Sequence, residues 1–143
     1  MTRNFTEAEY SQLVDRYKDF RKVNRRLHSA LLGYLPKKVL KKCAKKLGIS
    51  KSGTFVFREE HEVDVLIDYC IYDYHEDGEN AVSRYVTENP PNPGSDEHIV
   101  LNAMLESYHS LIQVEGIIER VGIRCRALEF LDTKLHIIML LFA

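Results

Sequence analysis

The spacing of apolar residues changes along the chain, and this change constrains the fold more than any other feature of the sequence. Up to about residue 108, apolar residues recur at helical spacing, as they do on one face of an α-helix. After that point they alternate with polar residues or form short continuous runs, as they do in strands. We therefore expect an α+β fold in which a helical N-terminal two-thirds precedes a small antiparallel sheet of about three strands.

Capping and breaking residues set the expected limits of the helices. Thr6 and Glu9 have the spacing of a capping box and Gly33 is a suitable stop, so a first helix is expected over about 7–32, with a break near Asn24 left open. Pro36 and Gly48 bracket a second helix. Three more helices are expected over about 59–74, 79–87 and 95–107. The first of these three is expected to bury Val63, Leu66, Ile67, Cys70 and Tyr74. The last is expected to bury Ile99, Val100, Ala103 and Met104.

The expected strands leave open what covers the last of them, which is almost entirely apolar. They span about 109–118, 120–128 and 135–142, with a shorter strand at 54–57 after a loop at 50–53. The run from Leu135 to Phe142 has no polar face, so it is central in its sheet, covered by a partner chain, or cut short by a truncated reading frame. Coverage by a second copy of the chain would make the protein a homo-oligomer through this apolar strand.

Length and composition favour one soluble domain. A chain of 143 residues has the usual size of a single domain. We expect it to contain a basic helical part (1–51), an acidic helical part (52–108) and a β meander (109–143). No apolar run reaches the roughly 20 residues of a membrane-spanning helix, and three cysteines without CxxC spacing favour buried free thiols. Since no secretion signal opens the sequence, we expect a cytoplasmic protein without a membrane span or a cofactor.

Charge is distributed unevenly, although the formal net charge is only −1. Residues 1–51 hold fourteen Lys and Arg against four Asp and Glu, a net charge of +10, and the remaining residues carry −11. This asymmetry predicts that the basic part contacts nucleic acid, an acidic protein or an anionic membrane surface. The alternative is that the basic helices dock on acids of residues 59–79, in the same chain or in a second copy.

The first two helices carry the candidate contact surface. On the second helix the apolar residues share one side, and six lysines fill the other. Lysines neutralise phosphates without reading the base sequence, so this pattern predicts salt-dependent binding; a face that is only solvated is the alternative interpretation. The predicted surface comprises Lys18, Lys22, Arg25, Arg26, Lys37, Lys38, Lys41, Lys42, Lys45 and Lys46.

A second candidate site lies on the third expected helix. His61, Asp64, Asp68, Tyr72 and His75 share one side at helical spacing, and His and Asp at such intervals can hold a metal ion or transfer protons. Because that side is opposite the apolar stripe, a solvated polar face is the alternative interpretation. No catalytic or nucleotide-binding motif is present. We therefore expect a non-catalytic binding domain, with a small enzyme or metal-binding protein as the alternative.

Part of the chain resembles a group of uncharacterised bacterial proteins. The similarity rests on the segments 68–73 (DYCIYD), 80–85 (NAVSRY), 89–91 (NPP) and 108–111 (YHSL). Some of those proteins carry a cysteine-rich tail of the SEC-C type that binds metal, and this sequence shows no such tail. The resemblance therefore implies no zinc site and no particular activity.

Overall fold

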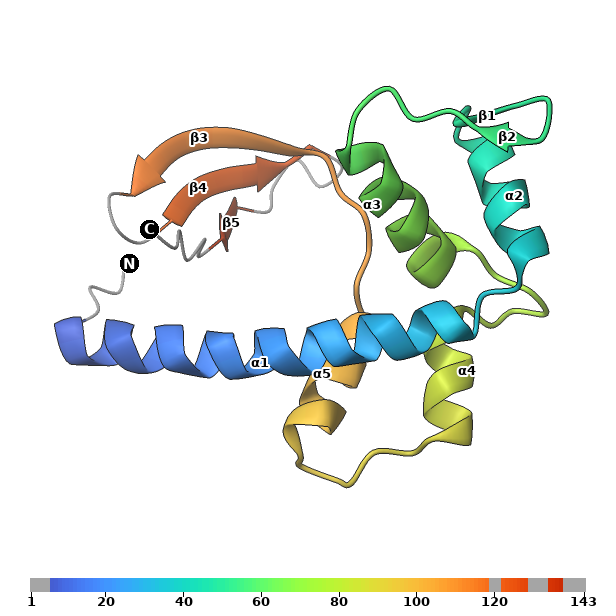
Figure 1. The fold of residues 1–143 in the computed structure, drawn as a ribbon. Coiled ribbons are helices and arrows are strands. Elements are labelled where there is room, and N and C mark those ends of the chain that lie inside the picture. Colours follow the sequence, from blue (N-terminus) through green and yellow to red (C-terminus); the bar gives the residue numbers. More distant parts are fainter. Residues whose placement is uncertain (1–5, 119–121, 129–133, 138–143) are drawn as a thin grey trace. The chain divides into compact units, whose positions relative to one another are not determined.

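Two compact units make up the chain, Met1–Ser107 and Tyr108–Ala143. The computed structural model describes residues 6–118, 122–128 and 134–137. Helices dominate the first unit and a three-stranded antiparallel sheet forms the second, so the expected α+β fold is confirmed (Figure 1). One domain spanning the whole chain stays a prediction.

The first helix, α1 (Glu7–Gly33), is continuous and begins at the expected capping box. The Thr6 hydroxyl accepts a hydrogen bond from the backbone N–H of Glu9 at 3.3 Å, and the Glu9 carboxylate accepts one from the backbone N–H of Thr6 at 2.8 Å. These bonds satisfy N–H groups that have no partner inside the helix. Near the other end, Leu27 and Leu31 are fully buried. The C-terminal half of α1 therefore supplies its share of the core.

The second helix, α2 (Lys37–Lys46), begins directly after Pro36, as expected. Its buried side chains are Val39, Cys43 and Ala44, which lie on one face. This burial fixes the rotation of α2 about its axis, so the lysines are directed away from the core.

A short hairpin follows α2. It consists of β1 (Ser50–Lys51) and β2 (Thr54–Phe55), which pair antiparallel. The expected loop over 50–53 is wrong at Ser50 and Lys51, which form a strand. It is confirmed at Ser52 and Gly53, which adopt positive φ, 52° and 82°, as a two-residue hairpin turn requires.

A π-helical turn changes the face that the next helix buries. The two helical segments are α3 (His61–Asp68) and η1 (Tyr69–Asp73). The Tyr74 N–H donates to the Tyr69 carbonyl at 3.0 Å, and this bond to the fifth residue back adds a residue to the turn. Leu66, Cys70 and Ile71 are buried, whereas Val63 is 37% exposed. The expected stripe is therefore wrong at Val63 and omits Ile71.

Two short helices complete the first unit, α4 (Ala81–Glu88) and α5 (Asp96–Leu105). Asn80 caps α4 through a hydrogen bond from the Ser83 N–H at 2.9 Å, and Ser95 caps α5. On α5 the buried residues are Val100, Leu101 and Met104. Helix α5 packs against both α1 and α4, and this packing buries Leu101. The expectation that Ile99 and Ala103 point inward is wrong, because Ile99 is 43% exposed and Ala103 is also exposed.

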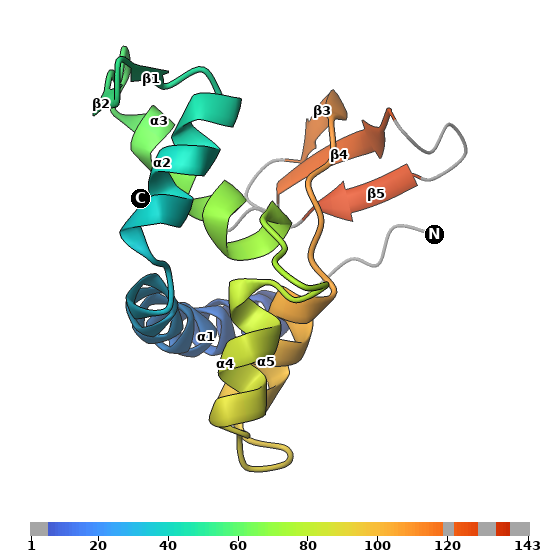
Figure 2. The same cartoon turned by 90° about the vertical axis from the view of Figure 1, so that its right-hand side faces the viewer.

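The core of the first unit is formed by buried residues between Leu27 and Met104. Figures 1 and 2 show that α4 and α5 lie on a different side of α1 from α2 and α3. The C-terminal half of α1 thus contacts helices on two sides, which is why its apolar stripe is fully covered there.

The second unit is an antiparallel meander in the order β3-β4-β5. Its strands are β3 (Ile112–Ile118), β4 (Gly122–Ala127) and β5 (Lys134–Ile137). Arg126 pairs with Glu115 across the sheet at 3.0 Å, an opposite-charge pair on neighbouring strands. The rest of the expected last strand, 138–142, lies outside the described residues, so a homo-oligomer through it stays a prediction.

Candidate functional site

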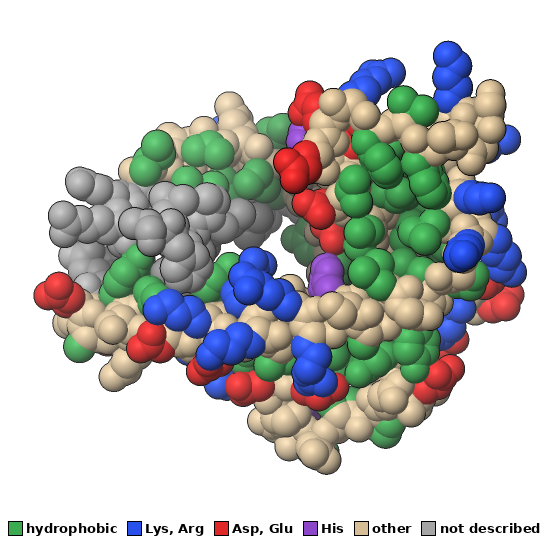
Figure 3. Space-filling model, in the orientation of Figure 1, with side chains coloured by type: hydrophobic (Ala, Val, Ile, Leu, Met, Phe, Trp, Pro, Cys, Tyr) green, Lys and Arg blue, Asp and Glu red, His purple; other side chains and the backbone are tan. Residues whose placement is uncertain are grey.

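Helix α2 presents all six of its lysines to solvent in two rows. Within a row the lysines are four residues apart, which is about 6 Å along the helix axis. Figure 3 shows Lys and Arg side chains gathered over α2. We call Lys38, Lys42 and Lys46 the inner row and Lys37, Lys41 and Lys45 the outer row, because the two rows differ in what they contact.

The inner row lies against tyrosine rings from the π-helical turn and the residue after it. The Lys42 ammonium is 5.3 Å from the centre of the Tyr74 ring, and the Lys46 ammonium is 5.5 Å from the centre of the Tyr69 ring. Both distances are within the range of cation–π attraction. The Tyr69 side chain also raises the pKa of Lys46, so this lysine keeps its charge.

An acidic residue at the end of the inner row is already balanced. The Glu76 carboxylate lies 4.0 Å from Lys38 and 3.8 Å from Arg84. It lies next to the turn at Asp77 and Gly78, where both residues adopt positive φ. The carboxylate therefore does not cancel the charge of the whole row.

The outer row is the least engaged group of cations. In the part of the chain that the structure describes, Lys37, Lys41 and Lys45 are exposed and make no ion pair or aromatic contact. Their charges are therefore available to an external anion.

Two hollows follow one another along the inner row. The larger has a volume of about 330 Å³ and the smaller about 190 Å³, and both are lined by Lys42 and Tyr74. We call them together the lysine–tyrosine groove. The larger hollow is lined by Lys42, Cys43, Lys46, Tyr69, Asp73, Tyr74 and His75, and the smaller by Lys38, Val39, Lys42, Tyr74 and Glu76.

The basic residues of α1 are more fully paired than those of α2. Arg26 contacts Glu97 of α5 at 2.7 Å, and this hydrogen bond raises the pKa of Arg26. Lys18 and Lys22 pair with acids three residues before them, at 3.4 and 3.0 Å. Arg25 is exposed. The structure therefore places the α1 part of the predicted surface at a lower net charge than the α2 part.

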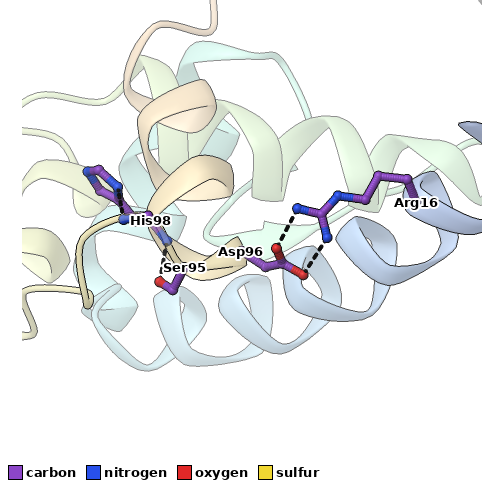
Figure 4. Close-up of polar contacts among 5 residues, drawn as sticks. Arg16, Ser95, Asp96 and His98 are labelled. Atoms are coloured by element: carbon purple, nitrogen blue, oxygen red, sulfur yellow. Dashed lines mark hydrogen bonds and ion pairs between the residues drawn. The ribbon is translucent and has the colours of Figure 1, made fainter.

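A further ion pair joins α1 to the start of α5. Arg16 donates two hydrogen bonds to the Asp96 carboxylate, at 3.0 and 2.6 Å, as Figure 4 shows beside the Ser95 cap. Asp96 and Glu97 occupy the first turn of α5, where negative charge is favoured. The acidic start of α5 thus attracts the basic face of α1.

The structure does not assemble the predicted His/Asp site. His75 lies beyond η1, and its Nδ1 is 3.0 Å from the Asp73 carbonyl oxygen, whereas His61 pairs with Glu59 at 3.3 Å. Tyr72, expected on the same outer side, is half-buried against His28 at 2.9 Å. Asp64 is exposed and Asp68 is half-buried. Among the described residues no group of three or more His, Cys, Asp and Glu side chains is arranged to hold a metal ion.

An apolar hollow of about 350 Å³ is a separate feature of the first unit. It lies between α1 and α5 and includes the π-helical Tyr72. Its lining consists of Phe20, Arg21, Asn24, Tyr72, Ile99, Val100, Ala103, Met104 and Ser107. Sequence reasoning missed both this hollow and the tyrosines of the lysine–tyrosine groove, because the π-helical turn that positions Tyr69 and Tyr72 leaves no clear sequence signal.

The fold and the site together define an α+β chain with a cationic helix beside a groove lined by lysine and tyrosine. The model of the Family of unknown function (DUF7986) matches residues 11–123, and the chain belongs to this family. The comparison agrees with the resemblance to uncharacterised proteins and brings no information about a SEC-C tail. No curated protein and no solved structure gave a match.

Within residues 6–118, 122–128 and 134–137, no helix combines the length and the apolar character needed to cross a bilayer.

Proposed function

We propose that the chain is a non-catalytic binding domain that contacts the phosphate backbone of nucleic acid through the lysines of α2. The outer row carries this proposal, because its three lysines are exposed and lack a carboxylate partner in the described part of the chain. Each phosphate contact releases condensed counterions, so such binding weakens steeply as the salt concentration rises.

The regular arrangement of the cations favours a nucleic-acid backbone over an acidic protein. Within each row the lysines follow one another at about 6 Å along a single helix, and a nucleic-acid backbone, which carries a charge on every nucleotide, can contact several of them at once. Lysine is a flexible point charge, which suits phosphate contact without base recognition. The proposal is therefore for binding without strong sequence preference.

The α1 cations extend the proposed surface with a smaller contribution. Lys18, Lys22 and Arg25 are exposed, but two of them already face an acid of their own helix. Arg26 is held by Glu97 and contributes least.

Fluorescence anisotropy with labelled RNA and DNA oligonucleotides at low and high salt tests the proposal. The variant Lys37→Gln/Lys41→Gln/Lys45→Gln removes the outer row. We expect it to weaken binding at low salt by about tenfold or more and to lower the salt slope by about three, since each phosphate contact contributes about one unit. The matched control Lys18→Gln/Lys22→Gln/Arg25→Gln removes equal charge from α1 and is expected to have a smaller effect.

Two outcomes contradict the proposal. Absence of binding to any oligonucleotide at low salt excludes nucleic acid as the partner. Equally tight binding of poly-glutamate at matched charge density indicates an acidic protein partner instead.

A further inference from the structure

We infer that the lysine–tyrosine groove of α2 binds single-stranded nucleic acid, with bases stacked on Tyr69 and Tyr74 and phosphates held by the inner row. This inference rests on the proposed function and specifies its ligand. Its basis is the pairing of cations with aromatic rings along one groove.

Each tyrosine of the groove is paired with a lysine of the inner row, whose ammonium lies over its ring. Lys42 lies 5.3 Å from the Tyr74 ring and Lys46 lies 5.5 Å from the Tyr69 ring. Proteins that bind single strands without sequence preference combine a cationic groove with rings on which bases stack. The same two elements lie side by side here, because Tyr69 of the π-helical turn and Tyr74, which directly follows the turn, line the larger hollow together with Lys42 and Lys46.

The dimensions of the groove suit a short stretch of strand. The inner row extends over about 12 Å, from Lys38 to Lys46. The larger hollow, of about 330 Å³, is within the usual range for a small bound molecule. Both tyrosines are half-buried, so each ring is anchored in the protein and only part of it is open to a ligand. A base that stacks on one of these ring faces displaces the lysine ammonium that lies over it, and that ammonium is then available to the adjoining phosphate.

Charge in the groove remains positive despite its two acids. Glu76 is shared by Lys38 and Arg84. Asp73 also lines the larger hollow, where Lys42 and Lys46 lie opposite it. The outer row adds three further cations next to the groove.

The geometry favours a single strand over a duplex. In a duplex the base faces are stacked inside the double helix and cannot reach a tyrosine ring, so a duplex contacts the lysines alone. A duplex carries more charge per unit length, and binding driven only by charge would prefer it. Preference for a single strand is therefore a specific sign of stacking.

Anisotropy titrations with labelled oligo(dT) and with a DNA duplex of the same length test the inference. We expect oligo(dT) to bind about tenfold more tightly than the duplex. The variants Tyr69→Leu and Tyr74→Leu are expected to lose about fivefold to a hundredfold of the affinity for oligo(dT), the range seen when a stacking ring is removed, and to keep duplex binding. Tyr69→Phe and Tyr74→Phe keep the ring and are expected to bind oligo(dT) like the unaltered protein.

Each alternative result has one meaning. If the duplex binds as tightly as oligo(dT), or if the Leu variants keep the preference for oligo(dT), the inference is overturned while the proposed function stands. If neither probe binds at low salt, the proposed function fails and the inference fails with it. A Leu variant with unchanged circular dichroism that binds neither oligo(dT) nor the duplex also overturns the stacking role. In that case the tyrosines affect binding in general and not by stacking on bases.

Discussion

Buried titratable side chains hold α2 and the π-helical turn together. Cys43 of α2 and Cys70 of η1 are both fully buried, and all three cysteines are free thiols, as the sequence predicts. Burial, assisted by the neighbouring Cys43, raises the pKa of Cys70 to about 12. Burial and the nearby Asp68 likewise raise the pKa of Tyr72 to about 12. The packing around the π-helical turn therefore requires both groups in their neutral forms.

This requirement predicts a loss of stability at alkaline pH. The ordinary pKa of a thiol is 9.0, so an unfolded chain releases the Cys70 proton above that pH while the folded chain keeps it up to about 12. The contribution of the protonated Cys70 thiol to the free energy of unfolding is complete below pH 9.0 and is lost as the pH rises toward 12. Urea unfolding at several pH values checks this.

The variant Cys70→Ala serves as the comparison. It is expected to be less stable at neutral pH by about 1 kcal/mol because a buried atom is removed, and to lose less stability than the unaltered protein above pH 9.0. If the free energy of unfolding falls with pH in the same way for both proteins, ionisation of Cys70 is not the cause of the alkaline loss of stability.

At the level of elements, local signals predict helix ends better than buried faces. The capping box at Thr6 acts within three residues, so the sequence predicts where α1 begins, and the helix ends at Gly33, one residue beyond the expected limit. The six lysines of α2 are exposed as expected, because the apolar residues of this short helix all lie on its other side. The face of α5 depends on two partner helices, and the positions of Tyr69 and Tyr74 depend on a π-helical turn, so neither could be predicted from periodicity.

The Asn80 side chain links two of these elements. Its Oδ1 accepts a hydrogen bond from the Ser83 N–H at 2.9 Å and caps α4, while its Nδ2 donates to the carbonyl of Tyr72 at 3.1 Å in the π-helical turn. We expect Asn80→Ala to lower the free energy of unfolding by about 2 kcal/mol, roughly half from the cap and half from the second bond.

The matched variant is Ser95→Ala. Ser95 caps α5 by accepting a hydrogen bond from the His98 N–H at 3.1 Å. Its loss is expected to cost about 1 kcal/mol, as for a typical cap. Urea unfolding of the two variants measures the difference. Equal losses would show that the bond from Asn80 to the π-helical turn contributes little.

At the level of the whole molecule, the charge asymmetry is resolved in part within the first unit. Asp96 and Glu97 engage α1, and Glu76 engages one lysine of α2. The expected docking of the basic helices on acids of residues 59–79 is therefore limited to Glu76 among the pairs described here. These pairs are largely exposed and each contributes little to stability. Among the described residues the outer row has no acidic partner, and this is the basis of the binding proposed above.

The location of the core predicts that the first unit folds on its own. Its buried cluster lies entirely between Leu27 and Met104, and the chain divides after Ser107. A unit with its own core is expected to fold independently. We expect a fragment of residues 1–107 to keep its helical circular dichroism and to unfold cooperatively in urea, with a free energy of unfolding within about 2 kcal/mol of the full chain. The fragment is also expected to bind oligo(dT) as the full chain does, since α2, Tyr69 and Tyr74 all lie within it. A fragment that lacks a cooperative transition would show that residues 108–143 are needed for folding, and would support a single domain over the whole chain.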